Sequence, residues 1–69
     1  MINTLGDNLK QARTQKNLSS KDTAKLIGVS ASTWSLYEAN KRIPSFHTMI
    51  VISRKLEVSL DTLANGTLK

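Results

Sequence analysis

Five times along the chain, a serine or threonine stands directly before a short segment whose apolar residues recur at helical spacing. A hydroxyl in that place accepts a hydrogen bond from a free amide in the first turn of a helix, so it marks a helix start. The five residues are Thr4, Ser19, Ser30, Ser45 and Ser59. No segment keeps up the alternation of apolar and polar residues typical of a strand. The sequence therefore predicts an all-α fold of five short helices.

The ends of the helices carry their own signals. Thr4–Asp7 and Ser19–Asp22 have the spacing of a capping box, in which a hydroxyl and a side chain three residues later satisfy two free amides. The first helix is expected to stop near Asn17. Gly28 is placed to end the second, since glycine adopts the left-handed conformation without a Cβ clash. Asn40 is expected to take the same conformation after the third helix.

The apolar positions predict which face of each helix is buried. Trp34 and Tyr37 are three residues apart and therefore share a face, where aromatic residues more often pack in a core than stack on bases. The predicted core consists of Leu5, Leu9, Ala12, Leu18, Ala24, Ile27, Trp34, Tyr37, Phe46, Met49, Ile52, Ser53, Leu56, Leu60 and Leu63.

Size and charge limit the functions that fit. Sixty-nine residues make one domain, expected over 1–69, and such a chain buries only about 60% of its unfolded surface, which leaves little room for a catalytic site. There is no cysteine, so no disulfide or thiolate metal site forms, and a cytoplasmic location is expected. Ten Lys and Arg against five Asp and Glu give a net charge of +5, which favours a polyanionic partner, with solubility alone as the alternative.

Residues 20–39 combine two short helices, a glycine-containing turn and a small alanine in the first helix, which is the pattern of a helix-turn-helix. Ala24 permits close packing of the two helices, and Gly28 permits the sharp turn between them. Trp34 is expected to hold the inner side of the helix that follows Ser30. The outer side of that helix is then free to enter a DNA major groove about 12 Å wide.

The segment Gly28–Glu38 resembles the recognition segment of the Cro and phage-repressor type of helix-turn-helix protein. Pro44–Phe46 is similar to that family's entry into a fourth helix, and Leu56–Asp61 and Asn65–Gly66 to the boundaries of a fifth. The resemblance covers roughly residues 5–66. It implies a five-helix, lambda-repressor-like domain of bacterial or phage origin, associated with the nucleoid. It further implies transcriptional repression through a homodimer on a near-palindromic operator, with half-sites about 34–36 Å apart.

The resemblance also implies a role for individual positions. Base-reading side chains are expected at Ala31, Ser32, Thr33 and Leu36. Contacts to the DNA backbone are expected from Ser19, Ser20, Lys21, Ser35, Asn40, Lys41 and Arg42. Arg13 and Glu38 match a structural ion pair. A dimer patch is placed at Ile50, Val51, Leu60, Ala64 and Leu68, because the family dimerises through its C-terminal helices; the alternative is that these residues complete a small core.

Several positions depart from the family pattern. Ala31 and Leu36 stand where Gln, Arg or Lys is usual, so base reading would rely on Ser32, Thr33 and packing against a thymine methyl group. Thr23 stands where an apolar residue usually packs. Glu57 stands where glycine usually ends the fourth helix, so we expect that end to need another cap.

Two other function classes compete with DNA binding. The first is an antitoxin or other protein-interaction module on the same fold. The second is a small enzyme, which the sequence disfavours because it has no recognisable nucleophile, metal cluster or phosphate-binding glycine loop. His47 has no second histidine or cysteine for a metal site and is expected on the surface. We therefore predict no enzyme activity, cofactor, metal, small-molecule ligand or membrane partner.

Overall fold

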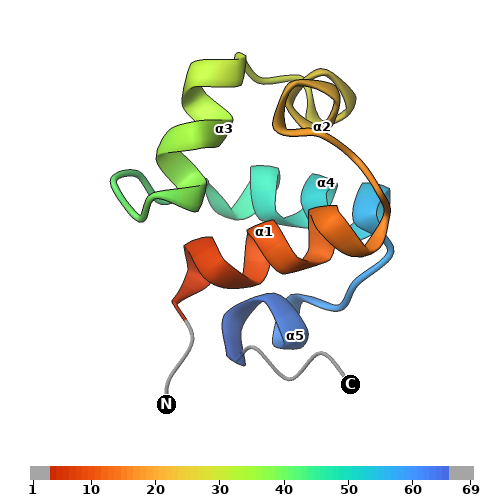
Figure 1. The fold of residues 1–69 in the computed structure, drawn as a ribbon. Coiled ribbons are helices and arrows are strands. Elements are labelled where there is room, and N and C mark those ends of the chain that lie inside the picture. The colour runs from red at the N-terminus through yellow and green to blue at the C-terminus, as the bar shows by residue number, and fades with distance from the viewer. Residues whose placement is uncertain (1–3, 66–69) are drawn as a thin grey trace.

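The computed structural model describes residues 4–65, which form five α-helices and no strand (Figure 1). The helices are α1 (Leu5–Gln15), α2 (Ser20–Ile27), α3 (Ala31–Glu38), α4 (Phe46–Leu56) and α5 (Leu60–Asn65). The predicted all-α, five-helix class is confirmed. α1 crosses the middle of the molecule and packs against α3 on one side and α5 on the other, while α2 packs against α3 and α4 (Figure 1).

The predicted serine and threonine caps form at all five helix starts. Each hydroxyl accepts a hydrogen bond from the backbone amide three residues later, at 2.9–3.2 Å between oxygen and nitrogen. Within residues 4–65, the reciprocal carboxylate bond of a capping box forms at Thr4 but not at Ser19. The second predicted capping box is therefore only half formed.

Four residues in the left-handed region end the first four helices. Gly28 has a φ of 92°, and Asn17, Asn40 and Glu57 have φ values of 58°, 61° and 56°. The expectation that α4 would need a cap other than Glu57 is wrong. Glu57 takes the left-handed conformation itself, its amide donates to the carbonyl of Ser53, and its carboxylate pairs with the Lys16 ammonium.

The hydrophobic core lies where α1, α3, α4 and α5 meet and includes one residue of α2. Its buried members are Leu9, Ala12, Ala24, Trp34, Tyr37, Ile52, Leu56 and Leu63. Trp34 is the largest of the fully buried side chains, so the inner side of α3 is anchored at the centre of the domain. This places the opposite side of the same short helix at the surface.

Two predicted core residues are exposed. Phe46 is 75% exposed because it is the first residue of α4, one turn before Met49. Met49 packs against the core, whereas the apolar side of α4 extends past the core at Phe46. Leu60 is 38% exposed and begins the six-residue α5, which is anchored through Leu63. Periodicity identifies the side of a helix that is apolar, but it does not show how far along the helix the neighbouring helices extend.

Two polar side chains, Asn8 and Thr23, are fully buried. Thr23 Oγ1 donates to the carbonyl of Ser19 at 2.8 Å, so this hydroxyl occupies an apolar position with its donor satisfied. Asn8 Nδ2 donates to the carbonyl of Leu63 at 2.6 Å and joins α5 to α1. Sequence reasoning missed Asn8, since its partner lies 55 residues away.

Candidate nucleic-acid interface

The predicted helix-turn-helix is formed by α2 and α3, which pack against each other. Ala24 lies on the buried side of α2 and belongs to the core. A larger side chain there would hold α2 and α3 apart. Gly28 ends α2, and the amide of Val29 then donates to the carbonyl of Ala24 at 3.0 Å. Ser30, two residues after Gly28, caps α3, so the turn is short and closed by hydrogen bonds.

α3 has one buried and one exposed side. On the buried side, the rings of Trp34 and Tyr37 lie 6.0 Å apart and meet edge to face at 80°. The exposed side, which we call the outer face of α3, consists of Ala31, Ser32, Ser35 and Leu36. Leu36 is 37% exposed and is the one large apolar side chain among these four residues.

Thr33 lies between the two sides of α3 and is half-buried. Its backbone amide donates to Ser30 Oγ at 3.0 Å, and the Ser30 hydroxyl in turn donates to Thr33 Oγ1 at 2.8 Å. Thr33 therefore takes part in the cap of α3. Of the four residues predicted to read bases, the structure places Ala31, Ser32 and Leu36 on the outer face and Thr33 at its edge.

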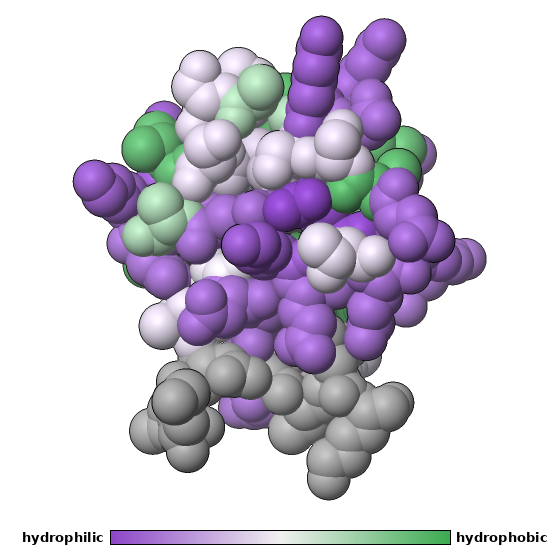
Figure 2. Space-filling view, viewed as in Figure 1, coloured by the Kyte–Doolittle hydropathy of each residue, from purple (hydrophilic) through white to green (hydrophobic). Residues whose placement is uncertain are grey.

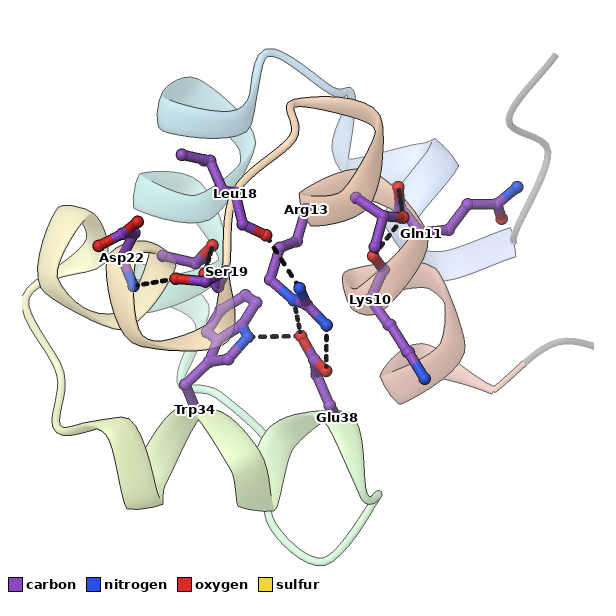
Figure 3. Close-up of polar contacts among 10 residues, drawn as sticks. Lys10, Gln11, Arg13, Leu18, Ser19, Asp22, Trp34 and Glu38 are labelled. Atoms are coloured by element: carbon purple, nitrogen blue, oxygen red, sulfur yellow. Dashed lines mark hydrogen bonds and ion pairs between the residues drawn. The ribbon is translucent and has the colours of Figure 1, made fainter.

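A charged network holds the end of α3 on α1 (Figure 3). Arg13 Nε and Nη2 donate to the two carboxylate oxygens of Glu38 at 2.6 and 3.1 Å. Arg13 Nη1 also donates to the carbonyl of Leu18 at 2.9 Å, and Trp34 Nε1 donates to Glu38 Oε2 at 2.5 Å. Because two-point pairing of guanidinium and carboxylate fixes an angle as well as a distance, this network orients α3 relative to α1.

Six of the seven residues predicted to contact the DNA backbone lie in two segments, and the seventh, Ser35, lies on the outer face of α3. At the start of α2, Ser20 is half-buried and Lys21 is exposed, while Ser19 Oγ accepts from the amide of Asp22 at 3.0 Å. After α3, both Lys41 and Arg42 are exposed. An open groove beside α2 and the start of α3 is lined by Lys21, Asp22, Ala24, Lys25, Val29 and Ala31. Four exposed basic residues, Lys21, Lys25, Lys41 and Arg42, thus lie on the segments before and after α3.

Asn40 differs from the other predicted backbone contacts. Its side-chain oxygen accepts from the amide of Gly6 at 2.9 Å, and its side-chain nitrogen donates to Thr4 Oγ1 at 2.8 Å. Both ends of this side chain are therefore used inside the domain, on the first turn of α1. Sequence reasoning assigned the left-handed backbone of Asn40 but missed these bonds, which join residues more than 30 positions apart.

The predicted dimer patch is divided between two helices that pack against each other. Ile50 and Val51 of α4 are half-buried, whereas Leu60 and Ala64 of α5 are exposed. Leu68 lies outside the described residues. The structure also exposes Ile43 and Phe46 around the start of α4, which sequence reasoning did not assign to any surface.

The molecular surface seen from the side of α1 is mainly hydrophilic, with hydrophobic residues toward its edges (Figure 2). Within residues 4–65, no helix has the length and apolar character needed to cross a membrane. In the same part of the chain, no three His, Cys, Asp or Glu residues are grouped as ligands for a metal ion. His47 is exposed at the start of α4.

The fold and the exposed outer face of α3 together define a helix-turn-helix domain. Residues 6–69 match the family described as "Helix-turn-helix domain", and the chain belongs to this family. The fold that the phage-repressor resemblance implies is likewise confirmed by structural similarity. The P22 c2 repressor DNA-binding domain aligns with a TM-score of 0.91 and 23% identity, covering 100% of this chain and 91% of that one.

Three further proteins are more similar to this chain in sequence than the P22 c2 repressor domain is. SinR, a master regulator for biofilm formation solved in complex with DNA, aligns with a TM-score of 0.81 and 34% identity over 87% of this chain and 97% of that one. Two proteins of Bacillus subtilis strain 168 are similar in sequence. The uncharacterized HTH-type transcriptional regulator YqaE is 40% identical over 87% of this chain and 52% of its own length. The prophage-derived HTH-type regulator YonR is 36% identical over 90% and 57%, so the chain spans about half the length of these curated relatives.

Proposed function

We propose that this domain binds duplex DNA in a sequence-specific manner and represses transcription. The observation that carries the proposal is the exposure of the outer face of α3 on a helix whose other side is fixed by Trp34 and Glu38. A rigid helix with one exposed side is the structure that enters a major groove in proteins of this class. The names of the relatives as transcriptional regulators, and the DNA complex of SinR, support the same function.

The basic residues beside α3 would supply most of the affinity. Lys21, Lys41 and Arg42 are exposed, and together with Ser19, Ser20 and Ser35 they are proposed to contact phosphate groups. The net charge of +5 adds a long-range attraction for a polyanion. Because each neutralised phosphate releases counterions, binding should weaken steeply as salt is raised.

Specificity would come from a small set of short side chains. The hydroxyl of Ser32 can donate to or accept from a base edge, and Thr33 lies at the border of the same surface. Ala31 and Leu36 have no polar side-chain atoms, and they would distinguish bases by packing on the methyl group of thymine. Such a surface makes few hydrogen bonds to bases, so the shape of the DNA would contribute more to selection.

We further propose that the protein acts as a symmetric dimer on a near-palindromic operator and blocks a promoter there. Two copies would place their α3 helices in successive major grooves about 34–36 Å apart. Ile50, Val51, Leu60 and Ala64 are the proposed dimer contacts within residues 4–65. This mechanism uses no cofactor and no enzymatic step.

Selection of bound sites from a random duplex pool, at stated salt, tests the whole proposal. The expected result is an enriched motif with two similar halves separated by about one turn of DNA. An enriched motif without symmetry would contradict the dimer. Failure to enrich any duplex, even in dilute buffer, would contradict the DNA-binding function and favour a protein-interaction module.

A further inference from the structure

We infer that Asn40 is a positioning residue for DNA binding, acting through a clasp that it forms with Thr4 and Gly6 on α1. This inference rests on the proposed function, since the clasp would place the two proposed DNA-contacting segments relative to each other. It assigns Asn40 a role other than the phosphate contact predicted from the sequence. The clasp is the pair of hydrogen bonds from the Asn40 side chain together with the close packing at Gly6.

The first part of the argument is where Asn40 lies. It stands between Leu36, on the outer face of α3, and the basic residues Lys41 and Arg42. The amide of Lys41 donates to the carbonyl of Leu36 at 2.9 Å, and the amide of Asn40 donates to that of Tyr37 at 3.2 Å. This pair of bonds is a Schellman motif with Asn40 in the left-handed position. Any movement of Asn40 would therefore move the base-reading helix and the basic segment together.

The second part is what holds Asn40. Its Oδ1 accepts from the amide of Gly6, one of the first-turn amides of α1 that has no carbonyl to bond within its own helix. Its Nδ2 donates to the hydroxyl of Thr4, which already caps α1 by accepting from the amide of Asp7 at 3.2 Å. A single side chain thus fixes the end of α3 to the start of α1 at two points.

The third part is the packing at Gly6. A Cβ added at this buried residue would overlap the backbone carbonyl oxygen of Glu38 and lie 2.8 Å from the carbonyl carbon and 2.9 Å from Asn40 Nδ2. The backbones of α1 and α3 are therefore in direct contact where the clasp forms, and backbone atoms cannot rotate away as a flexible side chain can. The Arg13–Glu38 pair holds the same end of α3 about two turns further along α1, so the two attachments together define an orientation.

The chain provides a matched control for this clasp. Asn17 follows α1 with a φ of 58°, close to the 61° of Asn40, and likewise occupies the left-handed position of a Schellman motif. Within residues 4–65, the side chain of Asn17 makes no hydrogen bond, in contrast to that of Asn40. Asn17→Gly and Asn40→Gly therefore make the same change in the same backbone conformation, and only Asn40→Gly removes the clasp.

The first experiment compares these two variants with the unchanged protein under conditions where all three are folded. We expect Asn40→Gly to weaken binding to the selected duplex by up to about fivefold, the factor that corresponds to about one net hydrogen bond, because without the clasp the end of α3 must be ordered as DNA binds. Asn17→Gly should leave the affinity unchanged. Without DNA, hydrogen exchange at the Gly6 amide should be faster in Asn40→Gly only. Equal affinities for the two variants would overturn the positioning role. If the unchanged protein binds no duplex, the proposed function fails as well.

A second experiment separates positioning from a direct phosphate contact by Asn40. Thr4→Ala removes the hydroxyl that accepts from Asn40, and Thr4→Ser restores it. If Asn40 acts through the clasp, Thr4→Ala weakens DNA binding, Thr4→Ser rescues it, and the effects of Thr4→Ala and Asn40→Gly are not additive. Additive effects, or a Thr4→Ala protein that binds like the original, would overturn the inference.

Discussion

The two sides of α3 carry opposite kinds of residue. The inner side holds the large ring of Trp34 and the paired carboxylate of Glu38, both in contact with other helices. The outer side holds Ala31 and Ser32, which are exposed and small. Under the proposed function, stability and DNA specificity would therefore depend on different residues of one eight-residue helix. Substitutions on the two sides should therefore separate cleanly in a stability assay and a DNA-binding assay.

The largest effect is expected from the centre of the inner side. Trp34→Ala should lower the free energy of unfolding by about 3–5 kcal/mol, because it leaves a large cavity in the core. That is a large part of the total stability of a small domain. Leu36→Ala, two residues away on the outer face, should cost about 1 kcal/mol or less. Urea titrations followed by circular dichroism would measure both.

If Trp34→Ala does not fold, Trp34→Phe provides the same comparison. It keeps an aromatic ring in the core but removes the indole donor to Glu38. We expect a loss of stability larger than that of Leu36→Ala and smaller than that of Trp34→Ala. Equal stabilities of Trp34→Phe and Leu36→Ala would contradict the assignment of stability to the inner side.

The next effect concerns the ion pair between α1 and α3. Glu38→Gln removes a charge from a carboxylate that accepts three hydrogen bonds and whose side chain is 13% exposed. We expect a loss of about 2–3 kcal/mol, since Arg13 is left without a counter-charge in a largely desolvated place. The matched control is Glu57→Gln, which removes the partner of Lys16 at an exposed site and should cost less than about 1 kcal/mol. Equal losses of stability for the two variants in urea titrations would show that the Arg13–Glu38 pair stabilises the fold no more than an exposed ion pair does.

How far the sequence predicts this molecule depends on the range of the interaction. The helix starts follow from Ser and Thr and an amide three residues later, so a short window of sequence contains the whole interaction. Phe46 was misassigned because its burial depends on where α4 extends past the core, which no local pattern records. The left-handed backbone of Glu57 was missed because a residue other than Gly or Asn rarely adopts it.

In the candidate site, too, the features that depend on neighbouring residues were predictable, and those that depend on distant residues were not. The outer face of α3 follows from the position of Trp34 and the helical period, so the exposure of Ser32 and Leu36 was predictable. The role of the Asn40 side chain was not, because its partners Thr4 and Gly6 lie more than 30 residues away in the chain. Resemblance to a family locates the positions of a site, whereas the bonds that hold these positions in place require coordinates.

A smaller effect is expected from the basic segment that follows α3. Arg42→Ala should weaken binding to every duplex by a similar factor, about tenfold, and reduce the salt dependence by roughly one phosphate contact. Arg54→Ala is the matched control, since Arg54 is also exposed but lies in the last turn of α4, at the far end of that helix. Affinities on matched and scrambled operators at several salt concentrations would test this. A loss confined to the matched operator would instead make Arg42 a base-reading residue.

The smallest effect, and the one that most sharply tests the comparison of the two sides, is expected on the outer face itself. Leu36→Ala should change the preference between matched and scrambled operators by about fivefold, because packing against one thymine methyl group is lost. Leu26→Ala removes the same atoms from a side chain of similar exposure, 41% against 37%, but on α2. We expect that control to keep the original preference. If the two variants lose affinity equally on both operators, Leu36 contributes only nonspecific contact, and specificity would have to come from Ser32, Thr33 and the shape of the DNA.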